Sequence, residues 1–365
     1  MYLRKSLSKC LFGSDIGLAD LTVDQIRILR LAICLSTCFI CAIALAWPLA
    51  YLSPMLLCSL IGSPKKPLAL KSGIGLLMLI FLAFFPFVLM GFIIPRWPGV
   101  SALLLIIGFY YIFYLKAVGK LPELAAVLFL VGITIMPLMA LTQPELSLSF
   151  TLGFLFSAFI AVVSAWLSFL VFPDPKGCSY NEAVKPKNNL QKHEAQVKAL
   201  TSTIAITPLA LIFYSNNLIE ASLVFAFVAI LMQNPDIGTN LKAGAGLLLG
   251  NLLGGIISYM IFVFLKSTPT LPFFAFLMLL SLLLLGQRIF SEHKFSGLYS
   301  ASLSTVILLL GSVTGSAGGD FEEKFLSRMV QLFCASTYVV LSLIVLKGLL
   351  RKKALKYLAR FEATS

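Results

Sequence analysis

Long apolar runs separated by short polar segments recur along the whole chain. Runs such as 74–94, 148–172 and 243–265 are long enough to cross a hydrocarbon core about 30 Å thick, which takes about 20 helical residues. They lack the alternation of apolar and polar residues that membrane β-strands need, so the pattern predicts an all-α polytopic membrane protein. We expect about twelve transmembrane helices, six in each half. Their predicted ranges are 28–46, 49–62, 73–94, 99–115, 121–141, 148–172, 200–216, 219–234, 243–265, 271–287, 296–316 and 329–348.

The second half of the chain repeats the first at an offset of 171 positions. For example, Lys71-Ser-Gly73-Ile-Gly75 aligns with Lys242-Ala-Gly244-Ala-Gly246. The pattern predicts a first six-helix repeat with its N-terminal segment over 1–172, a linker over 173–199 and a second repeat over 200–348. Because each repeat has an even number of spans, both would enter the membrane in the same direction. A pseudo-two-fold axis along the membrane normal would then relate them.

Basic residues are distributed unevenly over the loops of this topology. With the N-terminus in the cytoplasm, all but four of the 28 Lys and Arg residues fall on the cytoplasmic side. The positive-inside rule therefore predicts that both termini, and the linker, are cytoplasmic. The formal net charge of +13 is a topology signal on this interpretation, since no nucleic-acid-binding module is present. The basic segment 349–365 is expected to form an amphipathic helix on the anionic inner leaflet, with partner docking as the alternative.

The second predicted span of each half is short and contains candidate substrate-binding residues. Span 49–62 contains Ser53-Pro54, and its counterpart ends in Gln233-Asn234-Pro235. Short or interrupted segments at corresponding positions of two repeats are typical of a transport site, because freed backbone groups and side-chain amides can bind a polar solute. The alternative is a short tilted span with an ordinary proline kink and a polar loop.

The third predicted span of each half contributes further candidates. Gly246, Gly250 and Gly254 have the spacing that lets helices approach closely, and Asn251 lies among them. An amide at this depth needs a partner, which is either another helix or a solute. Lys71 and its counterpart Lys242 lie near the predicted cytoplasmic ends of their spans. They would either attract anions to an inner vestibule or anchor the helices to lipid phosphates.

Ionisable groups inside the predicted spans are few. Glu123 and Asp236, each at a predicted cytoplasmic helix end, are the candidates for proton coupling, with a solvated helix-end charge as the alternative. Cys34, Cys38 and Cys41 share one helical face, and we interpret them as packing residues because no His or carboxylate joins them. The sequence has no nucleophile set, metal-ligand set or Walker A loop, so we expect neither an enzyme nor a cofactor.

Two segments resemble the fusaric-acid-resistance-like (FUSC-like) membrane proteins, a group that includes the aromatic acid exporters. They are Arg27-Ile-Leu-Arg30-Leu-Ala with Trp47-Pro48 and Ser53-Pro54, and Gly238-Thr239 followed by Gly244-x-Gly246. The resemblance implies a bacterial inner-membrane exporter of organic or aromatic acids that works with a periplasmic adaptor of the membrane-fusion type. Larger members carry a sizeable cytoplasmic domain, whereas this chain has only the short linker.

Three functions remain open from the sequence. The first is a secondary transporter that exports small organic anions, and the second is a passive organic-anion channel of the same design. The third is a non-transporting membrane scaffold of a larger complex, which the short loops disfavour. The sequence leaves the substrate, the coupling ion and homo-oligomer formation undetermined.

Overall fold

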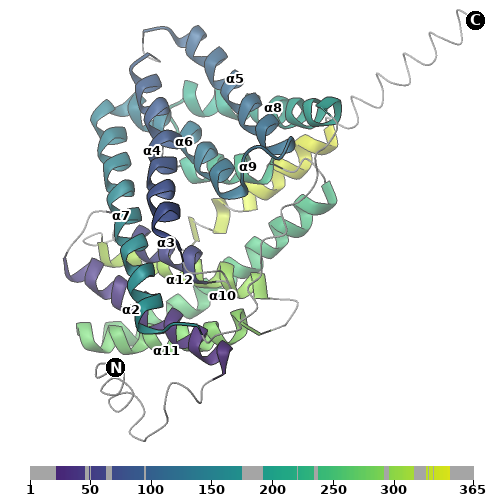
Figure 1. Ribbon diagram of the computed structural model, residues 1–365. Coiled ribbons are helices and arrows are strands. Elements are labelled where there is room, and N and C mark those ends of the chain that lie inside the picture. The colour runs from purple at the N-terminus through teal and green to yellow at the C-terminus, as the bar shows by residue number, and fades with distance from the viewer. Residues whose placement is uncertain are drawn as a thin grey trace, which may run out of the picture. The chain divides into compact units, whose positions relative to one another are not determined.

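The structure is a computed structural model that describes eleven stretches of the chain. They are residues 22–45, 49, 51–62, 68–93, 96–174, 192–219, 221–233, 237–291, 296–315, 326–331 and 333–345, with residue 328 excepted. Within these stretches every regular element is a helix, which confirms the predicted all-α class (Figure 1). The predicted C-terminal amphipathic helix over 349–365 and most of the linker over 173–199 lie outside the described residues.

Twelve helical segments account for nearly all of these residues. Each of them overlaps one of the apolar ranges that the sequence predicts. They are α2 (Val23–Ala44), α3 (Leu52–Ile61), α4 (Leu70–Ile93), α5 (Pro98–Ala117), α6 (Glu123–Thr142), α7 (Pro144–Val171), α8 (Lys192–Ser215), α9 (Ser222–Leu231), α10 (Ile237–Ser267), α11 (Leu271–Ile289), α12 (Ser296–Gly315) and an apolar helix over Met329–Val345.

Local sequence explains where several of these helices begin. Thr22 caps α2, because its hydroxyl accepts a bond from the Gln25 amide while the Gln25 side chain accepts one from the Thr22 amide. This reciprocal capping box satisfies two backbone donors that have no partner inside the helix. Pro98 is the first residue of α5 and Pro122 directly precedes α6. A proline is well tolerated there, since its missing N–H would have no helical acceptor.

The helices form two compact units, and each unit combines segments from both halves of the sequence. The first unit comprises Met1–Leu77, Gly153–Val184 and Leu249–Leu326. Its buried core joins α2 and α3 to α11 and α12, and the rings of Phe39 and Phe274 lie 5.7 Å apart at its centre. The core therefore depends on contacts between residues far apart in the sequence.

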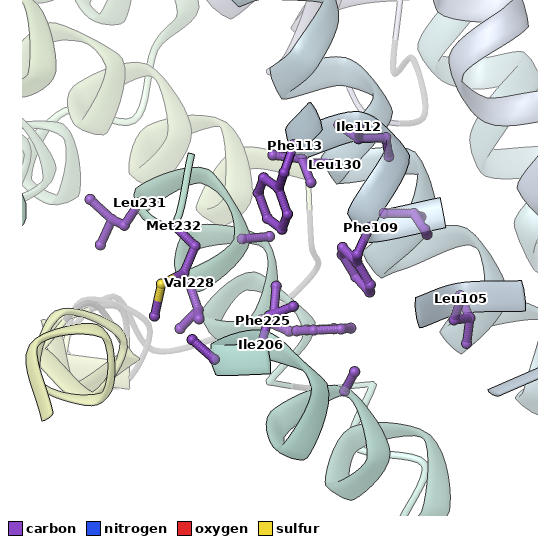
Figure 2. Packing of buried hydrophobic residues seen from close by; sticks show 14 of the residues in the cluster. Leu105, Phe109, Ile112, Phe113, Leu130, Ile206, Phe225, Val228, Leu231 and Met232 are labelled. Carbon is purple, nitrogen blue, oxygen red and sulfur yellow. The ribbon is translucent and has the colours of Figure 1, made fainter. Parts of the chain in front are cut away.

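The second unit comprises Met78–Leu152, Lys185–Leu248 and Ser327–Ser365. Its core gathers α5, α6, α8, α9 and the helix over Met329–Val345. Phe225 of α9 is fully buried and contacts Phe109 of α5 and Phe213 of α8, with ring centroids 5.9 and 5.1 Å away (Figure 2). Large aromatic side chains such as these contribute strongly to packing in a core of this kind.

Corresponding helix pairs pack inside the two units. In the first unit α2 packs on α11 and α3, and α12 packs on α11 and α3. In the second unit α8 packs on α5 and α9, and α6 packs on α5 and α9. An offset of about 171 residues relates α2 to α8, α3 to α9, α5 to α11 and α6 to α12. The same set of pairings thus occurs twice.

Eight of the described helices are long and apolar enough to cross a membrane, so the chain is a multi-pass membrane protein. They are α2, α4, α5, α6, α7, α8, α10 and α11. By contrast, α3 and α9 have ten residues each and rise about 15 Å, about half the thickness of a hydrocarbon core. The count of twelve spans stays a prediction.

The structure changes the interpretation of Ser53-Pro54. The sequence predicted that this pair interrupts a helix over 49–62. Instead, Pro54 is the third residue of α3, in the first helical turn. A proline there removes no helical hydrogen bond, because the first amides of a helix have no acceptor within it. The proline therefore lies near the start of a short helix and does not break a longer one.

Two of the predicted small residues on α10 bring this helix close to α12. A Cβ atom added at Gly250 would lie 2.7 Å from the Cβ of Ala301, and one at Gly254 would lie 2.5 Å from the carbonyl oxygen of Ser302. Real Cβ atoms do not approach other atoms so closely. This geometry supports the interpretation of the glycine spacing as a helix-packing surface.

Replacing Gly254 with alanine should destabilise the protein. The new methyl group would press on the backbone of α12, and overpacking of this kind costs about 1–3 kcal/mol. Gly297 of α12 is the matched control, because a Cβ there meets no described atom within 4 Å. Thermal unfolding in detergent should show a clearly lower unfolding temperature for Gly254→Ala and an unchanged one for Gly297→Ala. Equal unfolding temperatures would contradict the close packing.

Candidate functional site

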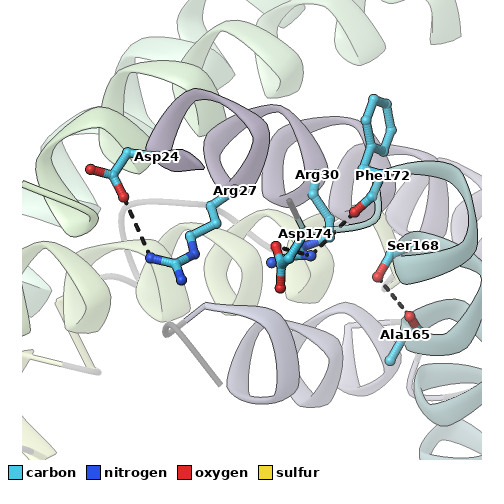
Figure 3. Close-up of polar contacts among 7 residues, drawn as sticks. All are labelled: Asp24, Arg27, Arg30, Ala165, Ser168, Phe172 and Asp174. Atoms are coloured by element: carbon cyan, nitrogen blue, oxygen red, sulfur yellow. Dashed lines mark hydrogen bonds and ion pairs between the residues drawn. The ribbon is translucent and has the colours of Figure 1, made fainter. Parts of the chain in front are cut away.

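An arginine is completely buried on a helix of membrane length. Arg30 of α2 is 1% exposed, and its Nη1 donates hydrogen bonds to Asp174 Oδ1 at 2.9 Å and to the Phe172 carbonyl at 3.2 Å (Figure 3). Its guanidinium carbon also lies 4.0 Å from the ring centroid of Phe169. Phe169 lies in the last turn of α7, and Phe172 and Asp174 lie just beyond its end. These contacts therefore join α2 to the end of α7.

The ion pair between Arg30 and Asp174 uses only some of the hydrogen-bonding atoms of each side chain. The Asp174 side chain is 2% exposed, so both partners are shielded from bulk water. Asp174 Oδ2 and Arg30 Nε have no hydrogen-bond partner among the described residues. A buried charged group without its full set of hydrogen bonds is costly. Among the described residues the pair therefore lacks one acceptor for Arg30 and one donor for Asp174.

A second arginine lies one turn earlier on the same helix. The side chain of Arg27 is 9% exposed, and its Nη1 lies 3.5 Å from Asp24 Oδ1. Because the Asp24 side chain is 62% exposed, this contact is a surface ion pair that contributes little to stability. The start of α2 therefore places two shielded guanidinium groups near each other, and Arg30 is the deeper of the two.

A cavity of about 660 Å³ lies between α2 and α7, and neither Arg30 nor Asp174 is among the residues that line it. Its lining is largely apolar and includes the hydroxyls of Thr37 and Ser164, together with Cys34 and Cys38 of α2. Phe172, whose carbonyl accepts the bond from Arg30, also lines it. Its volume falls within the range of about 300–1,000 Å³ that is usual for small-molecule sites.

The second unit contains a polar cluster of its own. Lys116, in the last turn of α5, donates a hydrogen bond to Gln233 Oε1, just beyond the end of α9. Its Nζ also lies 4.0 Å from Glu123 Oε1, at the start of α6. The Lys116 side chain is 16% exposed and that of Glu123 is 83% exposed. The cluster therefore consists of a shielded cation, a shielded amide and a solvated carboxylate.

The structure brings only some of the predicted site residues together. Gln233 and Glu123 meet at Lys116 in the second unit. In the first unit Ser53 is buried, with its Oγ 3.9 Å from the Sγ of Cys38, and Pro54 is buried beside it in α3. Lys71 is exposed on α4.

Three other predicted positions are less defined. Asn234 and Asp236 lie outside the described residues. Lys242 falls within the helical range of α10, but its side chain is outside the described part of the chain. Lys198, which follows Arg27 by 171 positions, differs from it in environment, because Arg27 is buried and Lys198 is exposed. The proposed roles of these residues therefore remain predictions.

Asn251 has the partner that a buried amide requires. It is 5% exposed on α10, and the hydroxyl of Thr305 on α12 donates a 2.8 Å hydrogen bond to its Oδ1. Of the two alternatives that the sequence left open, this contact supports a bond to a neighbouring helix. It lies next to Gly254, whose close approach to α12 brings the two side chains within reach.

Sequence reasoning missed Arg30, Asp174 and Lys116 as members of polar sites. All three were assigned to cytoplasmic segments or helix ends, where basic residues were interpreted as topology signals. A signal was present for Arg30, because Arg27 and Arg30 are spaced so that both lie on one side of a helix that directly continues an apolar run. Nothing in the sequence pairs Arg30 with Asp174, which is 144 positions away.

The bond between Asn251 and Thr305 should couple the two side chains energetically. Asn251→Ala and Thr305→Val should each lower the free energy of unfolding. The double variant should lose less of this free energy than the two single variants lose together. We expect a coupling of about 0.5–2 kcal/mol, the range seen for hydrogen bonds between membrane helices. A double-mutant cycle by thermal unfolding in detergent measures it. Additive losses would show that the bond contributes nothing.

The two partners of Lys116 should differ in importance. Gln233→Leu leaves the shielded ammonium without its hydrogen-bond acceptor and should cost about 1–3 kcal/mol of unfolding free energy. Glu123→Gln removes an exposed and distant charge, and should change it by less than about 1 kcal/mol. Unfolding of both variants under the same conditions tests this order. A larger loss for Glu123→Gln would mean that the carboxylate holds the cluster.

One protein family matches part of the chain. It is described as "Protein of unknown function (DUF2955)", and it is a family of membrane proteins. The match covers residues 27–168, from the start of α2 into α7, and so includes Arg30. Searches among curated proteins and among solved structures each gave no match. Over this stretch the chain is therefore similar to a membrane-protein family, and its likeness to the FUSC-like proteins stays a prediction.

Proposed function

We propose that this protein is a secondary transporter that exports small organic anions across the bacterial inner membrane. The observation that carries the proposal is Arg30, a fully buried cation on a helix of membrane length. A buried charge is costly wherever it lies, and Arg30 lies near the end of α2 that the charge pattern predicts to be cytoplasmic, where an exported anion would enter. The planar guanidinium matches the geometry of a carboxylate, so an organic carboxylate is the anion that this site fits best.

The matching helix pairs of the two units support a duplicated transporter architecture. In our proposal twelve helices form two parallel six-helix repeats, with both termini in the cytoplasm. The pairing of α2 with α11 and of α8 with α5 means that each unit contains helices of both repeats. Rocking of one repeat against the other would then open the pathway to alternate sides, as in transporters with internal repeats.

The cavity between α2 and α7 gives the proposed substrate a place for its organic part. A carboxylate near Arg30 would leave its apolar body against a largely apolar wall. In the second unit, Lys116 and Gln233 are the candidate polar residues that would bind or guide anions. Glu123, whose exposed carboxylate lies 4.0 Å from Lys116 Nζ, is the described candidate for proton coupling. A periplasmic adaptor belongs to the proposal through the family resemblance alone.

A transport assay with charge-balanced variants tests the function. Cells that contain the protein should accumulate less of one or more labelled carboxylates than cells without it, and a protonophore should abolish the difference. Arg30→Gln combined with Asp174→Asn removes both charges of the buried pair, so it avoids an uncompensated charge, and it should remove export. Arg288→Gln, which changes an exposed arginine on α11, is the matched control and should export normally.

The other outcomes separate the alternatives. Accumulation that follows the membrane potential, with or without protonophore, would favour a passive anion channel. Export by the charge-neutral variant at the normal rate would remove Arg30 from the mechanism. If no carboxylate in a panel of aliphatic and aromatic acids shows any difference, the proposed function is wrong and the membrane scaffold becomes the better hypothesis.

A further inference from the structure

We propose that Asp174 is an internal ligand of Arg30, a carboxylate of the chain itself that occupies the place where an external carboxylate binds. This inference deepens the proposed function and rests on it, because it concerns regulation of the same arginine. Release of Asp174 would free Arg30 for a substrate, and substrate binding would keep Asp174 away. In this proposal the ion pair is the arrangement in which Asp174, and not an external carboxylate, binds Arg30.

The geometry of the pair is the first argument. Arginine offers five N–H donors, and a carboxylate can bind it through two parallel bonds. Here Asp174 takes one bond, from Nη1, and its own Oδ2 has no partner among the described residues. Arg30 Nε likewise has no hydrogen-bond acceptor among the described residues. A ligand that is free to orient could use both of its oxygens, which would offset part of the advantage that tethering gives to Asp174.

The position of Asp174 on the chain is the second argument. It lies three residues beyond the end of α7, and its backbone is not helical. Rotation about the backbone near Pro173 would withdraw the carboxylate and leave the helical hydrogen bonds of α7 intact. A carboxylate within the helix would be held far more rigidly. The pair therefore joins an arginine within a helix to an acid that lies outside one.

The corresponding positions in the second half are the third argument. At the offset of 171 residues, Arg30 corresponds to Thr201 and Asp174 to Val345. Thr201 donates its hydroxyl to the carbonyl of Val197 on its own helix. The second unit thus packs its equivalent helices without a charged pair at these positions. The pair is an addition to the shared packing scheme and is not required by it.

The adjoining cavity is the fourth argument. The carbonyl of Phe172 accepts a hydrogen bond from Arg30. Phe172 also lines the cavity of about 660 Å³ between α2 and α7. Cys34, one turn after Arg30, lines it as well. Space for an organic anion therefore begins beside the residues that hold the internal ion pair.

Rescue by an added carboxylate tests the inference on the full-length purified protein. Asp174→Ala removes the carboxylate and leaves room for acetate beside Arg30. Acetate should raise the unfolding temperature of this variant by several degrees, because a ligand that binds only the folded state stabilises it. Acetamide has the same shape without the charge and should have no effect. Glu145→Ala, at the opposite end of α7 and exposed, is the matched control and should respond to acetate as the wild type does.

A second variant covers the case in which Asp174→Ala does not fold. Asp174→Asn keeps the shape and one acceptor oxygen but removes the competing charge. It should reach half-maximal binding of labelled acetate at a concentration about tenfold lower than the wild type, a typical size for coupling between competing ligands. Half-maximal binding at the same acetate concentration in the two proteins would overturn the inference. A folded Asp174→Ala variant whose unfolding temperature does not change with acetate would also overturn it.

These results can be told apart from failure of the proposed function. If the wild type exports carboxylates but neither variant responds to acetate as expected, Asp174 is a structural partner and the transporter proposal stands. If both variants bind acetate as expected but no form of the protein exports any carboxylate, the internal-ligand inference stands and the transporter proposal fails. If acetate binds to no form and none is exported, both are wrong.

Discussion

Hydrogen bonding of the backbone inside a hydrocarbon core is the constraint on which the rest of the structure depends. Apolar surroundings offer no partner for an N–H or a carbonyl, so each membrane segment must satisfy these groups within itself. Helices do this, and the described chain is built from them. Pro54, Pro98 and Pro122 lie at helix starts, where a missing donor costs little, whereas Pro86, Pro137 and Pro208 lie inside α4, α6 and α8. Interior prolines are tolerated in membrane helices because neighbouring groups can satisfy the freed carbonyls.

Once the backbone is satisfied, side chains decide how the helices pack. There is no hydrophobic driving force between two apolar helices in lipid, so close approach and a few polar bonds become important. α10 and α12 show both, through Gly254 against the backbone of Ser302 and through the bond between Thr305 and Asn251. The second unit relies more on large rings, with Phe225 held between α5 and α8.

Buried charge is the exception to this apolar design, and it is where function is proposed. Removing a guanidinium from water is costly unless a partner compensates it. Arg30 is compensated by a carboxylate, a carbonyl and an aromatic face, yet the described partners leave part of the arginine and part of Asp174 unsatisfied. The unsatisfied atoms of this pair are the reason that the proposed anion site is placed at Arg30.

The sequence by itself determined the helical class and the approximate range of each apolar helix, because both follow from local hydrophobicity and chain length. It also located Asn251 and the glycines of α10 as a polar and close-packing surface. It did not determine the partners of Arg30 or Lys116, since these lie 144 and 117 positions away and depend on which helices pack together. Nor did it show that each compact unit draws helices from both halves. Only tertiary packing decided these contacts, because burial and charge pairing are properties of neighbours in space.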